Sequence, residues 1–147
     1  MAAIRRAEVN WQGNLASGAG QVSGATSGAF KGLAVSWPSR TGEAAGTTSP
    51  EELLAAAHAS CYSMALSGEL GRAGSPPQSL SVVSEVSADS VDGRWTVVSS
   101  HLVVRGQVPG LDEARFREIA VAAKDGCPIS RALAGNVAVS VDASLER

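Results

Sequence analysis

Apolar and polar residues alternate along residues 7–12, a period of two that predicts a half-buried strand near the start of the chain. Short strand-like pieces separated by Gly18, Gly20 and Gly24 follow, and residues 30–37 are expected to form a third strand. The glycine-rich stretch does not match the dinucleotide fingerprint G-x-G-x-x-G and is not followed by a helix. It therefore predicts hairpin turns.

A different pattern begins after the polar, glycine-containing loop expected over residues 38–48. Ser49 is placed to cap a helix, Pro50 suits its first position, and two glutamates fall in its first turn. The helix should end near Gly71, ahead of two prolines. Its middle is apolar nearly all round, which is typical of a helix buried in a core or an interface.

The remainder of the chain predicts two strands, two helical segments and a last strand. Residues 80–86 and 95–104 are strand-like and joined near Asp92-Gly93, a hairpin dipeptide. Apolar residues at helical spacing over 111–123 predict a helix ending at Gly126, followed by a short helical turn from Cys127 and an alternating strand over 137–145. Hairpins grouped around helices, without regular βαβ alternation, favour an α+β fold in a single domain, residues 1–147.

Composition narrows the functional classes. A net charge of −2 and a pI near 5.6 offer no basic surface, so we expect no nucleic-acid partner. The longest apolar run, residues 53–66, contains polar side chains and falls short of the roughly 20 residues that cross a bilayer. The N-terminal residues lack an apolar stretch of signal-peptide length. We therefore expect a soluble cytoplasmic protein without a membrane partner.

The two cysteines, Cys61 and Cys127, are too few for a disulfide scaffold. A cysteine reacts as its thiolate, and Cys127 precedes Pro128 at a predicted helix N-terminus, where backbone N–H groups and the helix dipole favour negative charge. Cys61 lies in the middle of a helix, where the backbone has no spare donors. Two inert core thiols remain an alternative interpretation.

A reactive Cys61 would need a positive group from elsewhere in the chain. Lys31 and Arg40 are the basic residues between positions 7 and 71, and Arg40 lies just before the long helix. A carboxylate in the first turn would hold the guanidinium. With about 100° per helical residue, Glu51 falls about 80° around the axis from Cys61, whereas Glu52 falls on the opposite side, so Glu51 is the candidate partner.

Histidines supply two further interpretations. His58 lies one turn before Cys61, and a histidine on an apolar helix is more often a hydrogen-bonded core residue than a base or ligand. His58, Cys61 and Cys127 would give three zinc ligands, but no fourth ligand has useful spacing. A Cys-His hydrolase would need an orienting motif that His101 lacks. The residues therefore do not favour a metal site.

Two segments, residues 48–66 (TSPEELLAAAHASCYSMAL) and 126–133 (GCPISRAL), closely resemble the OsmC/Ohr family of osmotically inducible and organic hydroperoxide resistance proteins. Residues 7–14 (AEVNWQGN) and 108–112 (VPGLD) are similar to the family as well, so the resemblance spans nearly the whole chain.

This resemblance implies an α+β fold in which antiparallel sheets wrap around central helices in an intertwined homodimer. It also implies a peroxidase that reduces organic hydroperoxides with an external thiol or dithiol, without a metal or an organic cofactor such as flavin. By the resemblance, Cys61 is the attacking (peroxidatic) cysteine and Cys127 resolves the product as a disulfide, with Arg40 and Glu51 completing the site. The argument from the helix N-terminus alone favours Cys127, and not Cys61, as the sulfur that more readily forms a thiolate.

The position of the arginine favours the OsmC branch. In the Ohr branch the active-site arginine lies in the early strands, and residues 7–30 here contain none, whereas Arg40 shortly precedes the Pro-Glu-Glu helix start as in the OsmC branch. A non-catalytic redox sensor or binding protein that uses the same cysteine pair is the alternative function.

Overall fold

Residues 1–43 and 45–146 are described in a computed structural model of the chain. They fall into two units, Met1–Leu53 and Leu54–Arg147. The long helix α2, Pro50–Arg72, begins in the first unit and continues into the second. The expectation of a single domain over residues 1–147 stays a prediction.

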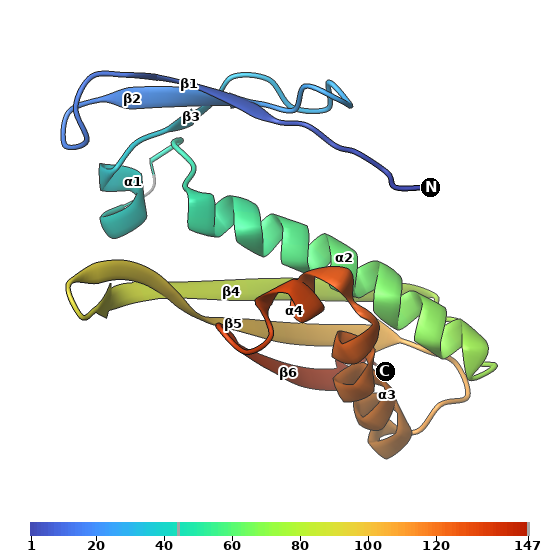
Figure 1. Cartoon of the computed structure of the whole chain (residues 1–147). Coiled ribbons are helices and arrows are strands. Elements are labelled where there is room, and N and C mark those ends of the chain that lie inside the picture. Colours follow the sequence, from blue (N-terminus) through green and yellow to red (C-terminus); the bar gives the residue numbers. More distant parts are fainter. Residues whose placement is uncertain (44, 147) are drawn as a thin grey trace. The chain divides into compact units, whose positions relative to one another are not determined.

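The first unit is a small antiparallel sheet followed by one helical turn (Figure 1). Its strands, in the order β1-β2-β3, are β1 (Glu8–Gln12), β2 (Ala19–Ser23) and β3 (Leu33–Val35). The predicted hairpin turns are confirmed, because β1 pairs antiparallel with β2 and β2 with β3.

Two details of this unit differ from the prediction. Strand β1 is exposed along its whole length and is not half-buried, because it is the edge strand and its Val9 and Trp11 side chains line an open cavity. The segment expected to be loop begins with a single helical turn, α1 (Pro38–Thr41), since Pro38 fixes the backbone at the first helical position.

Helix α2 begins as the sequence predicts. The hydroxyl of Ser49 accepts a hydrogen bond of 3.2 Å from the Glu52 amide, and Pro50 is the first helical residue. His58, Tyr62, Leu66 and Leu70 recur every four residues and are fully buried. The opposite side of the helix is open in this chain, where the Met64 side chain is 74% exposed. Only one side of the apolar helix therefore reaches the core of its own chain.

The second unit carries a sheet in the order β4-β5-β6. Strands β4 (Ser79–Val91) and β5 (Arg94–Gln107) form the predicted hairpin. Asp92 and Gly93, with φ of 50° and 74°, make the turn between them. Helices α3 (Glu113–Gly126) and α4 (Pro128–Leu133) then lead to β6 (Ala138–Leu145), which pairs parallel to β5. The α+β class is confirmed, but the expectation of purely antiparallel sheets is wrong for this sheet, because the connection through α3 and α4 brings β6 in parallel to β5.

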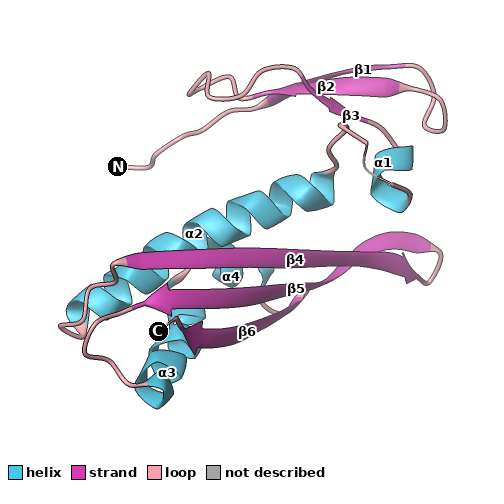
Figure 2. Cartoon of the chain, turned by 180° about the vertical axis from the view of Figure 1, so that it is seen from behind, coloured by secondary structure: helices cyan, strands magenta, loops and turns pink. Residues whose placement is uncertain are grey.

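All three helices of this unit lie on one face of the β4-β5-β6 sheet, as the front and rear views show (Figures 1 and 2). The core fills the space between the two layers, where Leu102 and Val104 of β5 meet buried residues of α2 and α3. Phe116 of α3 packs directly on Gly106, since a Cβ there would approach the ring to 2.7 Å. Cys127 belongs to this cluster, and Cys61 packs against it.

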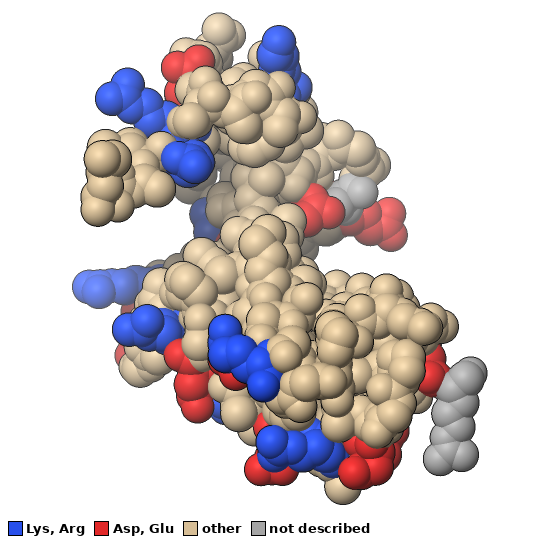
Figure 3. Space-filling model, turned by 90° about the vertical axis from the view of Figure 1, so that its right-hand side faces the viewer, with Lys and Arg blue, Asp and Glu red and all other residues tan. Residues whose placement is uncertain are grey.

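Acidic and basic side chains are mixed on the surface of the second unit. On the face drawn in Figure 3, Lys and Arg lie next to Asp and Glu. Pairs along the helices, such as Arg115 with Glu118 at 2.6 Å and Arg117 with Glu113 at 3.1 Å, account for part of this mixing. In the described part of the chain, none of the helices combines the length and apolar character that a membrane span requires.

Candidate functional site

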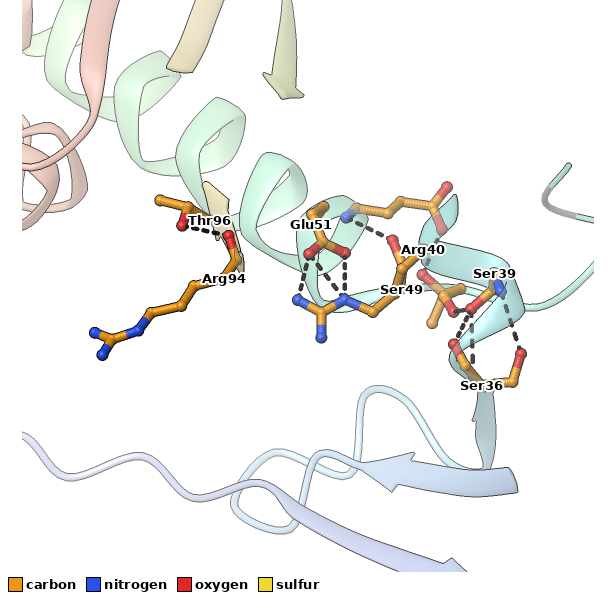
Figure 4. Close-up of polar contacts among 9 residues, drawn as sticks. Ser36, Ser39, Arg40, Ser49, Glu51, Arg94 and Thr96 are labelled. Carbon is orange, nitrogen blue, oxygen red and sulfur yellow. Dashed lines mark hydrogen bonds and ion pairs between the residues drawn. The ribbon is translucent and has the colours of Figure 1, made fainter. Parts of the chain in front are cut away.

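The first group of predicted site residues is the Arg40–Glu51 ion pair. Nε and Nη2 of Arg40 both donate to Oε1 of Glu51, at 3.0 and 2.6 Å, so the fork of the guanidinium is held by one carboxylate (Figure 4). Glu51 is nearly buried, whereas the Arg40 side chain keeps 27% of its surface exposed. The pairing proposed from helix geometry is therefore present in the structure.

Local hydrogen bonds place α1 so that Arg40 faces the start of α2. The Ser39 hydroxyl lies 2.7 Å from the carbonyl oxygens of both Ser36 and Thr48, which ties the helical turn to the chain on either side of it. The guanidinium carbon of Arg40 also lies 5.2 Å from the centre of the Trp37 ring, a cation–π distance.

Arg40 lines a cavity of about 360 Å³ in the first unit. The other lining residues are mostly apolar: Val9, Trp11, Leu15, Val22, Val35, Ser36, Trp37, Pro50 and Leu53. A single cationic donor in a mostly apolar wall suits a ligand with one small polar group and an alkyl or aryl body.

The second group is the cysteine pair in the second unit. Cys61 of α2 and Cys127 at the start of α4 are both free thiols, and the thiol of Cys61 hydrogen-bonds to the sulfur of Cys127. Cys127 is fully buried, while Cys61 is half-buried. Two sulfurs far apart in the sequence are thus close enough to interact with each other.

The environment of Cys127 favours its thiolate. Burial by itself would raise its pKa, but hydrogen bonds from the Ser130 hydroxyl and amide, the Cys61 thiol and the Ile129 amide outweigh burial and lower the pKa below the ordinary value. The Ser130 amide donates to Sγ at 3.5 Å, and Cys127 is the N-cap of α4. The sulfur therefore lies beside backbone amides at the N-terminus of α4, as the sequence predicts.

Cys61 is shifted in the other direction. Burial raises its pKa, the Ile129 amide lowers it by a smaller amount, and the nearby Cys127 sulfur raises it further. Within this unit, Cys127 is therefore the more acidic thiol, which agrees with the argument made from the residues alone. The exposure of the two sulfurs runs the other way, because a molecule from solvent reaches half-buried Cys61 more readily than buried Cys127.

His58 is a buried core residue with both ring nitrogens engaged. Nδ1 lies 2.6 Å from the Ser100 hydroxyl and Nε2 lies 2.7 Å from the Ser130 hydroxyl. Burial lowers its pKa, which favours the neutral ring. The zinc interpretation loses its histidine, because neither nitrogen points a free lone pair at the sulfurs. Among the described residues no group of three His, Cys, Asp or Glu side chains is placed to hold a metal ion.

Two serines in this environment were missed by the sequence argument. Ser130 follows Cys127 by three residues, and this spacing at a helix start is a recognisable indication that the Ser130 amide would reach the capping sulfur. Ser100 belongs to β5, and nothing in the sequence pattern connects it with His58. His101, the next residue, points elsewhere and pairs with Ser140 at 2.7 Å.

Comparisons with known proteins agree with the resemblance seen in the sequence. The family described as OsmC-like protein matches residues 42–142. The chain is 38% identical over 133 residues to the peroxiredoxin OsmC of Escherichia coli (strain K12), covering 90% of this chain and 92% of that protein. It is 33% identical over 111 residues to the organic hydroperoxide resistance protein of Xanthomonas axonopodis pv. citri (strain 306), covering 73% and 75%.

Solved structures show the same fold. An organic hydroperoxide resistance protein OsmC from Legionella pneumophila superposes with a TM-score of 0.74 at 26% identity, covering 97% of this chain and 99% of that one. The organic hydroperoxide resistance protein OhrB of Bacillus subtilis gives a TM-score of 0.74 at 28% identity, covering 95% and 98%. The predicted OsmC-like fold is therefore confirmed.

The structure brings Arg40 together with Glu51, and Cys61 together with Cys127. The assignment of catalytic roles to these four residues stays a prediction.

Proposed function

Because the chain belongs to the OsmC-like protein family, we propose that it is a cysteine-based peroxidase that reduces organic hydroperoxides to alcohols. Relatives named peroxiredoxin and organic hydroperoxide resistance protein support a peroxidase role. The observation that carries the cysteine mechanism is the hydrogen bond between Cys61 and Cys127, because a disulfide cycle needs two thiols within bonding reach.

In the first step, the Cys61 thiolate attacks the distal oxygen of the hydroperoxide. The O–O bond breaks, the alkoxide takes up a proton and leaves as the alcohol, and Cys61 becomes a sulfenic acid. Cys61 is the proposed attacking residue because it is the more accessible of the two sulfurs. Its raised pKa means that the step needs a cation to favour the thiolate.

Arg40 is the proposed cation. A guanidinium that stays charged at all relevant pH values stabilises a thiolate and the negative charge that develops on the leaving oxygen. Glu51 fixes its orientation through two N–H groups, and the Trp37 ring covers the guanidinium carbon. Such a preorganised donor loses little entropy when the peroxide binds.

In the second step, the Cys127 sulfur attacks Sγ of the Cys61 sulfenic acid. The S–O bond breaks, the released hydroxide takes up a proton and leaves as water, and a Cys61–Cys127 disulfide forms. An external thiol or dithiol then reduces the disulfide through a mixed disulfide. The lowered pKa of Cys127 suits this step, since the resolving sulfur must be a thiolate when it attacks.

The apolar cavity beside Arg40 supports a preference for organic hydroperoxides over hydrogen peroxide. Its walls, formed largely by Val9, Trp11, Leu15 and Trp37, would receive an alkyl or aryl group while Arg40 meets the O–O group. Burying apolar substrate surface contributes about 25 cal/mol per Å², a gain that hydrogen peroxide cannot obtain.

We propose that the protein works as a homodimer in which a second copy covers the open side of α2. Met64 on that side is 74% exposed, and the exposed positions of α2 also include Ala56, Ala57 and Ser60. Sedimentation velocity tests the assembly, and a species that stays monomeric at micromolar concentration would contradict it.

Turnover tests the proposed enzyme against the alternative of a redox sensor. Consumption of tert-butyl hydroperoxide is measured with excess dithiol reductant, and an enzyme removes many equivalents of peroxide per subunit. A sensor reacts once and then stops. Repeating the assay with a second, different dithiol shows whether the reaction stops only because the first reductant fails to reduce the protein. Stoichiometric consumption under both reductants would overturn the proposal and favour the sensor.

A further inference from the structure

His58 belongs to a chain of hydrogen bonds that the proposed reaction steps do not use. Its ring is fully buried between α2, β5 and α4, with Ser100 on one nitrogen at 2.6 Å and Ser130 on the other at 2.7 Å. The chain continues from Ser100 to Ser84 of β4, whose hydroxyl oxygens are 3.1 Å apart. Ser100 and Ser130 are buried, and Ser84 is half-buried.

The other end of this chain is the sulfur of Cys127. Both the hydroxyl and the amide of Ser130 hydrogen-bond to it, the amide at 3.5 Å. Ser130 has one hydroxyl proton, and a thiolate can only accept. When Cys127 is ionised, the Ser130 proton therefore points at the sulfur, and the oxygen of Ser130 must accept a hydrogen bond from Nε2 of His58.

This requirement fixes the tautomer of His58 in the thiolate state. A neutral ring that carries its proton on Nε2 has a lone pair on Nδ1, so Ser100 must donate to Nδ1 and accept from Ser84. Every donor and acceptor in the chain is then used. When Cys127 is instead a thiol that donates to Ser130, each hydrogen bond in the chain runs in the opposite direction. Ser130 then donates to Nε2 of His58, Nδ1 donates to Ser100, and every group again has a partner.

We propose that His58 is a positioning residue for Cys127: acting through Ser130, it holds the sulfur as a thiolate for disulfide formation, and the Ser84–Ser100–His58–Ser130 chain passes the thiol proton outward. The proton of Cys127 moves to Ser130, the Ser130 proton moves to Nε2 of His58, and the Nδ1 proton moves through Ser100 to Ser84. Ser84 is half-buried, so it exchanges the proton with water. The hydroxide released from the Cys61 sulfenic acid then takes a proton from solvent and leaves as water. This inference rests on the proposed function.

Few other groups in the described structure compete for control of Cys127. The titratable side chains that interact with it are Cys61 and Tyr62, both on α2. Tyr62 donates its hydroxyl proton to the Ala120 carbonyl, and burial raises its pKa further, so it stays neutral. A change in the His58–Ser130 pair should therefore appear directly in the ionisation of Cys127.

The experiment titrates Cys127 alone, in a Cys61→Ser background, by the ultraviolet absorbance of the thiolate. Tyr62 is the only tyrosine and its raised pKa keeps tyrosinate absorbance out of the range. Adding Ser130→Ala should raise the pKa of Cys127, so the thiolate fraction near neutral pH falls about tenfold for each rise of about one in the pKa. Ser130→Thr keeps a hydroxyl and should restore the lower value.

Two further variants separate positioning from general damage. Ser140→Ala removes a matched histidine–serine hydrogen bond, that of His101 at 2.7 Å, and should leave the titration unchanged. His58→Leu should raise the pKa of Cys127 even with Ser130 present, and combining it with Ser130→Ala should add little, because both act through one chain. An unchanged pKa in Ser130→Ala, or equal effects of Ser130→Ala and Ser140→Ala, would overturn the inference.

The titration is independent of peroxide turnover, so the two proposals fail separately. In the two-cysteine protein, Ser130→Ala should slow disulfide formation near neutral pH and recover at higher pH, while the first reaction with peroxide keeps its rate. Normal turnover together with a Cys127 pKa that ignores Ser130 would defeat only the positioning role. A Cys127 pKa that depends on Ser130, in a protein that does not turn over peroxide, would contradict only the proposed peroxidase function.

Discussion

The thiol of Cys61 hydrogen-bonds to the sulfur of Cys127, and the two sulfurs differ in both exposure and acidity. Cys61 is half-buried with a raised pKa, whereas Cys127 is fully buried with a lowered pKa. Accessibility and acidity are thus divided between the two residues. A reaction in which one sulfur meets the peroxide and the other attacks afterwards uses both properties.

The two cysteines should therefore give different defects when changed to serine. Cys61→Ser should reduce peroxide consumption to the background rate, because the accessible nucleophile is lost. Cys127→Ser should still react once with tert-butyl hydroperoxide and accumulate a sulfenic acid at Cys61, which a dimedone adduct in mass spectrometry would reveal. Both variants keep a hydroxyl that can hydrogen-bond to the remaining sulfur, so each serves as a control for the other. A sulfenic acid at Cys127 in the Cys61→Ser variant would reverse the assigned roles.

The buried His58 should make the protein less stable in mild acid. Its folded-state pKa is lowered by burial, so below the unfolded value of about 6.5 the unfolded chain binds a proton that the folded chain does not. Stability is therefore present above pH 6.5 and is lost as the pH falls toward the folded-state pKa, by at most about 1.4 kcal/mol per pH unit.

Urea denaturation at about pH 7.5 and about pH 5.5 measures this slope. His58→Gln keeps hydrogen-bonding groups but does not titrate, so its free energy of unfolding should change less between the two pH values. Ser60→Ala, which removes an exposed hydroxyl of α2 and no titrating group, is the control and should keep the slope of the unmodified protein. Identical slopes in all three proteins would contradict the prediction.

The sequence pattern located the helices and strands of this fold better than it predicted their burial and their pairing. The helix beginning at Ser49 and Pro50 was located by its cap, and the Asp92-Gly93 turn located the long hairpin, because both depend on local backbone chemistry. The parallel pairing of β6 with β5 was not visible, since it depends on how α3 and α4 cross the sheet. Strand β1 was expected to be half-buried, but alternation reports which residues share a face and not whether another layer covers it.

In the candidate site, too, contacts between residues close in the chain were predictable and contacts between distant elements were not. The Arg40–Glu51 pair and the placement of Cys127 at a helix start follow from residues close together in the chain or on one helix. The contact of Cys61 with Cys127 came only from the family resemblance, because α2 and α4 are distant in sequence. The link from His58 to Ser100 joins α2 to β5, and no pattern within either element indicates it.

Loss of the Arg40 charge should impair peroxide reduction more than loss of its carboxylate partner. Arg40→Met removes the proposed stabilisation of the leaving oxygen and should lower kcat/KM for tert-butyl hydroperoxide by at least about a hundredfold. Glu51→Gln keeps the charge and one acceptor and should cost less, since the guanidinium is only held less firmly. Arg115→Met, which breaks the exposed Arg115–Glu118 pair of similar length, is the control and should have no effect. Equal activity in Arg40→Met and Arg115→Met would remove Arg40 from the mechanism.

The apolar cavity beside Arg40 should determine which peroxides are preferred. Leu15 lines it and is 60% exposed, so Leu15→Ser should change the cavity wall with little effect on folding. Losing part of a leucine's contact with an aryl group would cost about 1 kcal/mol, or roughly a fivefold fall in kcat/KM for cumene hydroperoxide. Hydrogen peroxide has no apolar group, so its kcat/KM should stay the same. Val83→Ser provides the control, because Val83 on β4 is 52% exposed and lies outside this cavity. If the reaction with cumene hydroperoxide slowed no more in Leu15→Ser than in Val83→Ser, the alkyl or aryl group would have to bind elsewhere.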